Sequence, residues 1–133
     1  FHTPLLLDTS HRAQQELAGL PLSPPSTPLV AGDGRIFGRW TDPQDILDYT
    51  LGEQVTDTYD FFLSLKAALG DFAPDALVLP GPGDSLGGPV AQSLIQLRWR
   101  GIRDKQDFLD VQKSDKPVVL SMAWPKQRKE VVA

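Results

Sequence analysis

The sequence has no cysteine, one methionine and only two histidines among its 133 residues. The absence of cysteine excludes disulfides, thiolate metal sites and a cysteine nucleophile, and it agrees with an expected location in the reducing cytoplasm. The two histidines, His2 and His11, are not accompanied by an acidic pattern and are poor metal ligands. We therefore expect no bound metal.

The sequence also has no excess of positive charge and no long apolar run. Thirteen basic residues against 17 acidic ones give a net charge of −4, which favours neither nucleic acid nor an anionic membrane as a partner. The basic run at residues 126–129 is expected to be a solvated tail. No apolar stretch approaches the ~20 residues of a membrane helix, and residues 5–7 are too few for a signal peptide. The length suits one domain with its own core.

Proline and glycine divide the first half of the chain into short elements. We expect a helix at about residues 9–20 that begins at Thr9 or Ser10 and stops at Gly19. Residues 20–28, rich in proline, are expected to be an extended connector. Two short strands at 29–31 and 35–37 flank an Asp33-Gly34 turn. A further helix is expected to begin at residue 43 and end near residue 52.

The second half alternates helices and strands. We expect a longer amphipathic helix from about residue 57 to Gly70, and then a continuous apolar strand at 76–79 that is buried on both faces of a mostly parallel sheet. The glycine-rich turn at 81–83 precedes a helix capped by Asp84 or Ser85 that reaches residue 97. A helical segment near 106–112 and a strand at 118–120 follow. This alternation predicts an α/β fold class.

Two short segments could carry chemistry. His2 lies between Phe1 and Thr3-Pro4, where proline restricts the backbone, so it is either a positioned general base or an ordinary exposed histidine. The glycine-rich residues 81–88 are either a strand-to-helix turn or a phosphate cradle. The cradle lacks the G-x-x-x-x-G-K-[ST] spacing, and Asp84 would repel phosphate.

The letters GDSL at residues 83–86 match the nucleophile block of the GDSL esterases. In those enzymes the catalytic histidine follows the serine by a long stretch, whereas no histidine follows Ser85. Ser85 is therefore better explained as a helix cap. Paired carboxylates such as Asp104 and Asp107 are expected on a solvated helical face.

Taken in order, four segments resemble the C-terminal portion of malonyl-CoA:acyl carrier protein transacylases and of related acyltransferase domains in polyketide and fatty acid synthases. Residues 1–6 (FHTPLL) resemble the family block of an aromatic residue, histidine, Ser/Thr, any residue, Leu and Met/Leu. Residues 27–34 (TPLVAGDG) resemble the family hairpin, and residues 54–61 (QVTDTYDF) the segment after the next helix. Residues 76–88 (ALVLPGPGDSLGG) resemble its GPG element.

The resemblance implies a fold and a mechanism. The fold would be the C-terminal part of an α/β-hydrolase-like parallel sheet flanked by helices. In the family, a serine on a G-x-S-x-G elbow takes malonyl from coenzyme A and passes it to the phosphopantetheine thiol of acyl carrier protein. Carried over, His2 would be the general base, and the backbone carbonyl of Gln54 would orient its imidazole. Malonyl-CoA and phosphopantetheine would be substrates, with no permanently bound cofactor.

Several departures limit what this chain could do alone. The family's G-x-S-x-G elbow, its Gly-Gln oxyanion loop and its malonyl-binding arginine all precede the histidine block, and they have no counterpart here. The one G-x-S-x-G in the chain, residues 83–87 (GDSLG), follows His2 and lies inside the segment that resembles the GPG element. The hairpin Ser-Asn is replaced by Ala31-Gly32, and residues 98–133 have no counterpart and form an unassigned extension. We therefore expect an acyltransferase portion at 1–97 that is inactive without the family's N-terminal half and acts on acyl carrier protein. The alternative is a non-catalytic interaction module that retains the scaffold.

Overall fold

The computed structural model describes residues 2–83 and 85–132, which fall into two compact units, Phe1–Ala68 and Leu69–Ala133. Both units combine helices with a small sheet, and helices make up 51% of the structure. The chain is thus α/β only in a loose sense, because strands are few. The boundary of the compact units differs from residue 97, which marks the end of the family resemblance and stays a prediction.

The first helical segment begins earlier than expected. A 3₁₀ turn, η1 (Pro4–Leu6), is capped by Thr3 and leads directly into α1 (Leu7–Glu16). The N-cap expected at Thr9 or Ser10 is wrong, because Pro4 at the first helical position and the Thr3 side chain start the helix one turn before them. Ser10 is instead buried inside α1, where its hydroxyl donates to the Leu51 carbonyl at 2.5 Å.

The hairpin and the helix that follows it form as expected. Strand β1 (Leu29–Val30) pairs antiparallel with β2 (Ile36–Phe37), and Gly34 adopts a φ of +82° in the turn between them. Helix α2 (Pro43–Leu51) then begins at the Asp42 side chain, which accepts the Gln44 N–H. The local turn and cap residues are sufficient to determine both elements.

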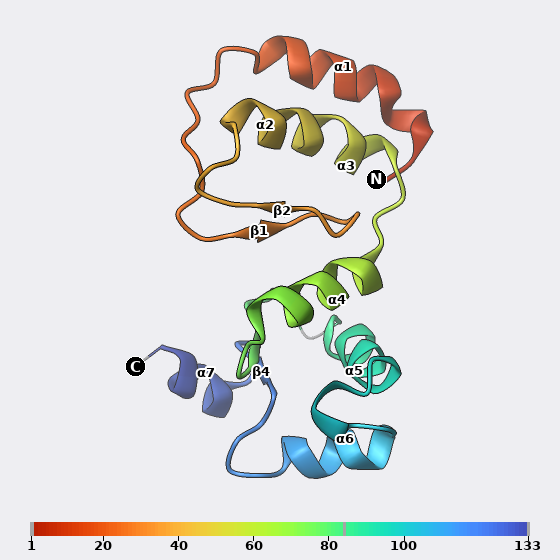
Figure 1. Cartoon of the computed structure of the whole chain (residues 1–133), viewed down its shortest axis with the longest axis vertical. Coiled ribbons are helices and arrows are strands. Elements are labelled where there is room, and N and C mark those ends of the chain that lie inside the picture. The colour runs from red at the N-terminus through yellow and green to blue at the C-terminus, as the bar shows by residue number, and fades with distance from the viewer. Residues whose placement is uncertain (1, 84, 133) are drawn as a thin grey trace. The chain divides into compact units, whose positions relative to one another are not determined.

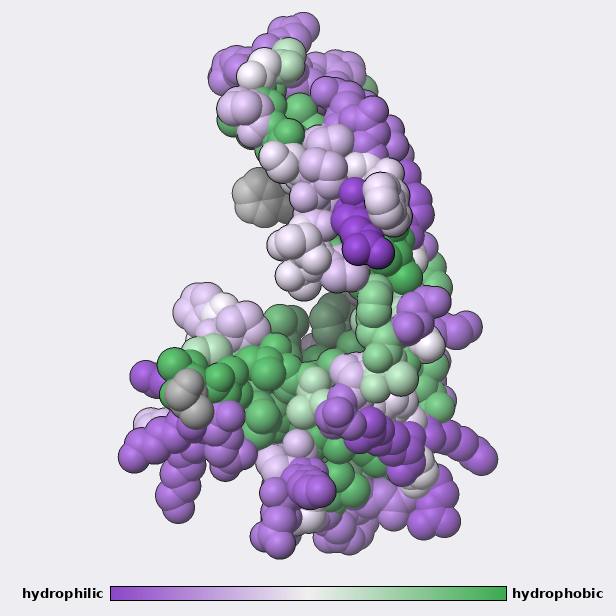
Figure 2. All heavy atoms as spheres, turned by 60° about the vertical axis from the view of Figure 1, so that its left-hand side comes forward, coloured by the Kyte–Doolittle hydropathy of each residue, from purple (hydrophilic) through white to green (hydrophobic). Residues whose placement is uncertain are grey.

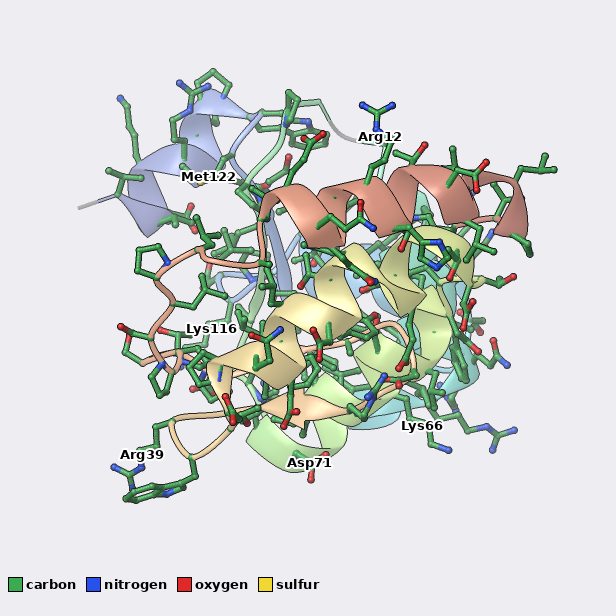
Figure 3. The ribbon with its side chains drawn as sticks, turned by 90° about the horizontal axis from the view of Figure 1, so that it is seen from above. Arg12, Arg39, Lys66, Asp71, Lys116 and Met122 are labelled. Carbon is green, nitrogen blue, oxygen red and sulfur yellow. The ribbon has the colours of Figure 1, made fainter. Side chains whose placement is uncertain are left out.

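A small core joins the hairpin to α2. Ala31 and Phe37 of the hairpin pack against Tyr49 and Ile46 of α2, and the Phe37 and Tyr49 rings lie 5.5 Å apart. Figure 1 shows α2 between α1 on one side and the hairpin on the other. The outer face of α1 is solvated, and Arg12 points away from α2 in Figure 3. Unit 1 is therefore layered about α2.

The expected long helix begins later than predicted, and a separate short helix precedes it. Helix α3 (Glu53–Thr56) follows α2 directly, and α4 (Phe61–Phe72) begins only after residues 57–60. The later start has a clear cause, because the Asp60 carboxylate accepts the Leu63 N–H at 2.9 Å and caps α4. The stop expected at Gly70 is wrong: α4 continues to Phe72, and Ala73 leaves the helical conformation with a φ of +42°.

Unit 2 contains a two-stranded parallel sheet. Strand β3 (Leu77–Leu79) pairs with β4 (Val119–Ser121), which confirms the two predicted strands. Helix α5 (Gly87–Gln96), the 3₁₀ turn η2 (Trp99–Gly101) and helix α6 (Lys105–Gln112) lie between them in the sequence. Val78 is 43% exposed, so the expectation of burial on both faces is wrong for this chain. The finer expectation of an acyltransferase-type sheet stays a prediction.

Side chains rather than strands occupy the far edge of β4. The Gln112 side chain accepts the N–H groups of Val118 and Val119 and donates to the Val119 carbonyl. Gln127 accepts the Ser121 N–H at 2.8 Å. Gln127 belongs to α7 (Pro125–Val131), a helix that includes the basic run expected to be a tail.

The glycine-rich turn before α5 has the backbone conformation that glycine permits. Gly81 and Gly83 have φ values of +94° and +78°. Helix α5 begins after Leu86 without a side-chain cap, so the cap expected at Ser85 is wrong. Asp84, the other expected cap, and Phe1 lie outside the described residues.

The core of unit 2 lies beneath α5 and beside β4. Its buried apolar side chains are Leu69, Val90, Leu94, Ile102, Val118 and Val119. Other apolar side chains remain at the surface, among them Val78, Leu86 and Trp124, and Figure 2 shows apolar surface gathered on unit 2. Within residues 2–83 and 85–132, none of the helices has the length and hydropathy needed to cross a membrane.

Candidate functional site

The structure brings together the two residues predicted for the site. His2 precedes η1 and Gln54 lies in α3, yet His2 Nδ1 is 2.5 Å from the backbone oxygen of Gln54. A second contact holds the same segments together, because the Thr3 N–H donates to the Val55 carbonyl at 3.2 Å. The N-terminal segment is therefore anchored to α3 at two successive residues.

The backbone at His2 has an uncommon conformation. Its φ of +64° lies in the left-handed region that few non-glycine residues occupy, although histidine is among the more tolerant types. Thr3, by contrast, is extended (φ −148°, ψ 142°), as expected for a residue before proline. Surrounding contacts hold such a conformation in place. Here they are the contacts of His2 with Gln54 and of Thr3 with Val55.

The contact with Gln54 determines which imidazole nitrogen carries the proton. A carbonyl oxygen can only accept a hydrogen bond, so in neutral His2 the hydrogen resides on Nδ1. Nε2 is then left with a free lone pair, and the His2 side chain is exposed to solvent. An imidazole in this state can accept a proton from a hydroxyl or a thiol that approaches Nε2.

Tyr59 forms a second wall of the site. Its ring centroid lies 5.6 Å from that of His2, with the two planes inclined at 46°. The Tyr59 hydroxyl donates to Ser64 Oγ at 3.3 Å, at the start of α4. Tyr59 lies in the segment 54–61 that resembles the family, but its spacing in the sequence predicted only a place on the apolar face of a helix.

An open cavity adjoins the imidazole. It has a volume of about 300 Å³ and is lined by His2, Thr50, Gln54 and Val55. A neighbouring cavity of about 190 Å³ includes Gln54 and Tyr59 in its lining. A reacting group from another molecule can therefore reach His2 without displacing the elements that hold it.

Charged side chains near α3 are paired. The Arg35 guanidinium donates hydrogen bonds to the carboxylates of Asp33 and Glu53, and it lies 5.1 Å from the Tyr49 ring centre. Desolvation raises the pKa of Asp33, but the hydrogen bonds and positive charge of Arg35 outweigh it, so the pKa lies below its ordinary value of 3.8. Arg35 thus links the hairpin turn to the first residue of α3.

No nucleophile accompanies His2 in this part of the chain. Within residues 2–83 and 85–132, no serine hydroxyl is hydrogen-bonded to His2; the buried Ser10 and Ser64 donate to the backbone carbonyls of Leu51 and Phe61 instead. The geometry alone therefore describes an oriented, accessible base.

The chain matches no protein-family model, no curated protein and no solved structure. Membership of the acyltransferase family therefore stays a prediction that rests on the four sequence segments. The roles assigned to His2 and Gln54 stay predictions as well.

Proposed function

We propose that this chain is the C-terminal portion of an acyl carrier protein S-acyltransferase, with His2 as its general base. The observation that carries the proposal is the 2.5 Å contact between His2 Nδ1 and the Gln54 carbonyl. These two residues were selected by resemblance alone, and 52 positions separate them in the sequence. Their contact gives the arrangement that the proposed mechanism requires.

The nucleophilic serine would be supplied from outside these 133 residues. Their one G-x-S-x-G, residues 83–87, follows His2 and lies in the GPG-like segment, whereas the serine elbow of the family precedes the histidine. As its Oγ attacks the thioester carbonyl of malonyl-CoA, Nε2 of His2 takes the hydroxyl proton. The imidazolium, held by the Gln54 carbonyl, then protonates the departing coenzyme A thiolate. In the second half-reaction His2 deprotonates the phosphopantetheine thiol of acyl carrier protein, and the serine regains its proton when malonyl leaves.

The proposal also concerns the fold. The parallel pair β3 and β4 would be the C-terminal strands of an α/β-hydrolase-like sheet whose other strands belong to the N-terminal half. An isolated two-stranded sheet is marginally stable, and parallel sheets normally have both faces covered. The exposed Val78 lies on a face of β3 that other elements of the complete enzyme would cover. The complete enzyme would act in the cytoplasm, with residues 98–133 as an extension of its C-terminus.

The experiment is an assay for malonyl transfer from coenzyme A to acyl carrier protein. The 133-residue chain is assayed alone and then together with an N-terminal acyltransferase half that carries the G-x-S-x-G serine. We expect transfer only from the mixture, and loss of that transfer in His2→Ala but not in His11→Ala, because His11 lies exposed on α1. Transfer by the chain alone would refute the proposal.

A mixture that is inactive but still binds acyl carrier protein would favour the non-catalytic interaction module instead. The sequence encoded upstream of Phe1 provides a second test. A G-x-S-x-G after a predicted strand, roughly one hundred residues before Phe1, is expected for an acyltransferase. A reading frame that starts close to Phe1 would contradict it.

A further inference from the structure

A single hydrogen bond does not fix the plane of an imidazole. The Gln54 carbonyl holds Nδ1 of His2, but an exposed imidazole can still turn about that contact or leave it, and once it has left the carbonyl either tautomer becomes available. The Tyr59 ring, inclined at 46° to the imidazole, packs beside it and limits this rotation. The direction in which Nε2 presents its lone pair therefore depends on where the Tyr59 ring lies.

The Tyr59 ring occupies space that only a glycine leaves free. A Cβ atom placed on Gly32 would lie 2.4 Å from Cδ2 of Tyr59 and 2.8 Å from Cε2, well inside van der Waals contact. The φ of Gly32 is not in the left-handed region, so backbone conformation does not require glycine here. The requirement comes from the close approach of the aromatic ring.

The backbone of Gly32 cannot move aside to relieve such a contact. Its N–H donates to the buried Tyr49 hydroxyl at 2.7 Å, and its carbonyl accepts the Asp60 N–H at 3.1 Å. Gly32 itself is buried. A side chain at this position would therefore displace the Tyr59 ring rather than the hairpin.

We infer that Gly32 and Tyr59 are positioning residues that hold the His2 imidazole in one orientation and one tautomer. Neither is a catalytic residue: Tyr59 acts through its contact with His2, and Gly32 acts through Tyr59. The inference rests on the proposed function for its catalytic significance, but its structural content can be measured without any acyl transfer. It also gives a physical reason for glycine at position 32, where the acyltransferase family has asparagine.

The test is the tautomer of His2 in the full 133-residue chain, measured by NMR on ¹⁵N-histidine-labelled protein at about pH 9, well above the ordinary pKa of a histidine side chain. We expect His2 to be mainly the Nδ1–H form, whereas exposed His11 should favour the Nε2–H form of free histidine. His2→Gln assigns the two sets of signals. Gly32→Ala and Tyr59→Leu should each move the tautomer populations of His2 toward those of His11.

Two variants serve as matched controls. Gly38→Ala adds the same methyl group at the other end of the hairpin, where nothing lies within 4 Å of the new Cβ, and should leave the His2 tautomer unchanged. Tyr59→Phe keeps the ring beside His2 and should also leave it unchanged. Amide spectra of every variant establish whether unit 1 remains folded. If Gly32→Ala disrupts the hairpin, the His2 tautomer in Tyr59→Leu is compared with that in Tyr59→Phe, and this comparison decides whether the Tyr59 ring positions His2.

An unchanged His2 tautomer in folded Tyr59→Leu would overturn the inference, as would a wild-type His2 that resembles His11. The assay of the mixed halves separates this failure from failure of the proposed function. Transfer activity with no tautomer response would refute positioning by Tyr59 and leave the acyltransferase proposal standing. A tautomer response without any transfer would support the positioning of His2 and count against the proposed reaction. In an active mixture, Gly32→Ala should lower kcat about tenfold, while Gly38→Ala should stay within about twofold of wild type.

Discussion

Replacing Tyr49 with phenylalanine tests the hydrogen bond that fixes the hairpin above α2. Tyr49 is 8% exposed, and its hydroxyl accepts the Gly32 N–H at 2.7 Å. The variant keeps the ring that packs against Phe37 and removes only the acceptor. Because the Gly32 N–H is then buried without a partner, we expect the free energy of unfolding to fall by about 1–3 kcal/mol.

Tyr59→Phe is the matched control, since it removes a hydroxyl from a tyrosine in the same unit. The Tyr59 hydroxyl donates over a longer distance, 3.3 Å, to Ser64 Oγ. Ser64 keeps another partner, because its own hydroxyl donates to the Phe61 carbonyl at 3.1 Å. We therefore expect a loss below about 1 kcal/mol.

The assay is urea unfolding of the whole chain, followed through the amide signals of unit 1 so that the two compact units are not averaged. With a denaturant slope of about 2 kcal/mol/M, Tyr49→Phe should lower the unfolding midpoint by about 0.5–1.5 M. Tyr59→Phe should lower it by less than about 0.5 M. Equal shifts in the two variants, or an unchanged midpoint in Tyr49→Phe, would refute the role assigned to the buried hydroxyl.

Three further predictions concern the site, its charges and the sheet. In the completed enzyme, His2→Ala should lower transfer by about 10²–10⁴-fold, and an unchanged rate would remove His2 from the mechanism. The lowered pKa of Asp33 stabilises the hairpin above the pKa that Asp33 has in the unfolded chain, and this contribution is lost as the pH falls through its folded-state pKa. As the pH is lowered, the free energy of unfolding of unit 1 should therefore fall less steeply in Asp33→Asn than in wild type. Identical dependence of this free energy on pH in the two proteins would contradict the Arg35 contacts. The isolated chain should associate or be partly disordered in solution scattering because β3 and β4 form so small a sheet; a well-ordered monomer would count against this.

Local signals predicted the parts of the fold that they determine. The Asp33-Gly34 turn sets the β1–β2 hairpin, and Asp42 with Pro43 sets the start of α2, because each acts on its own neighbours. The starts of α1 and α4 were missed because two competing caps were overlooked. Thr3 and Asp60 offered side-chain oxygens to backbone N–H groups at positions where the apolar pattern gave no signal.

The sequence likewise indicated some residues of the candidate site and not others. His2 and Gln54 were selected through the order of family-like segments, and the structure shows that these two residues are in contact. Composition and periodicity alone do not predict such a distant contact. Tyr59 and Gly32 could not be found in this way, since the need for glycine at position 32 arises only when the Tyr59 ring is placed against it. Likewise, the two strands of unit 2 were predictable as apolar runs, whereas the exposure of Val78 depends on what covers the sheet.

The glutamine side chains beside β4 leave the small sheet of unit 2 only one edge at which a further strand could pair. Gln112 and Gln127 use their amide groups as an incoming strand would use its backbone, so the far edge of β4 is already satisfied from Val118 to Ser121. Within residues 2–83 and 85–132, no side chain forms hydrogen bonds with the backbone of β3 in this way. A third strand, from whatever polypeptide, could extend this sheet only beyond β3, and the order of any larger sheet would be fixed from that side.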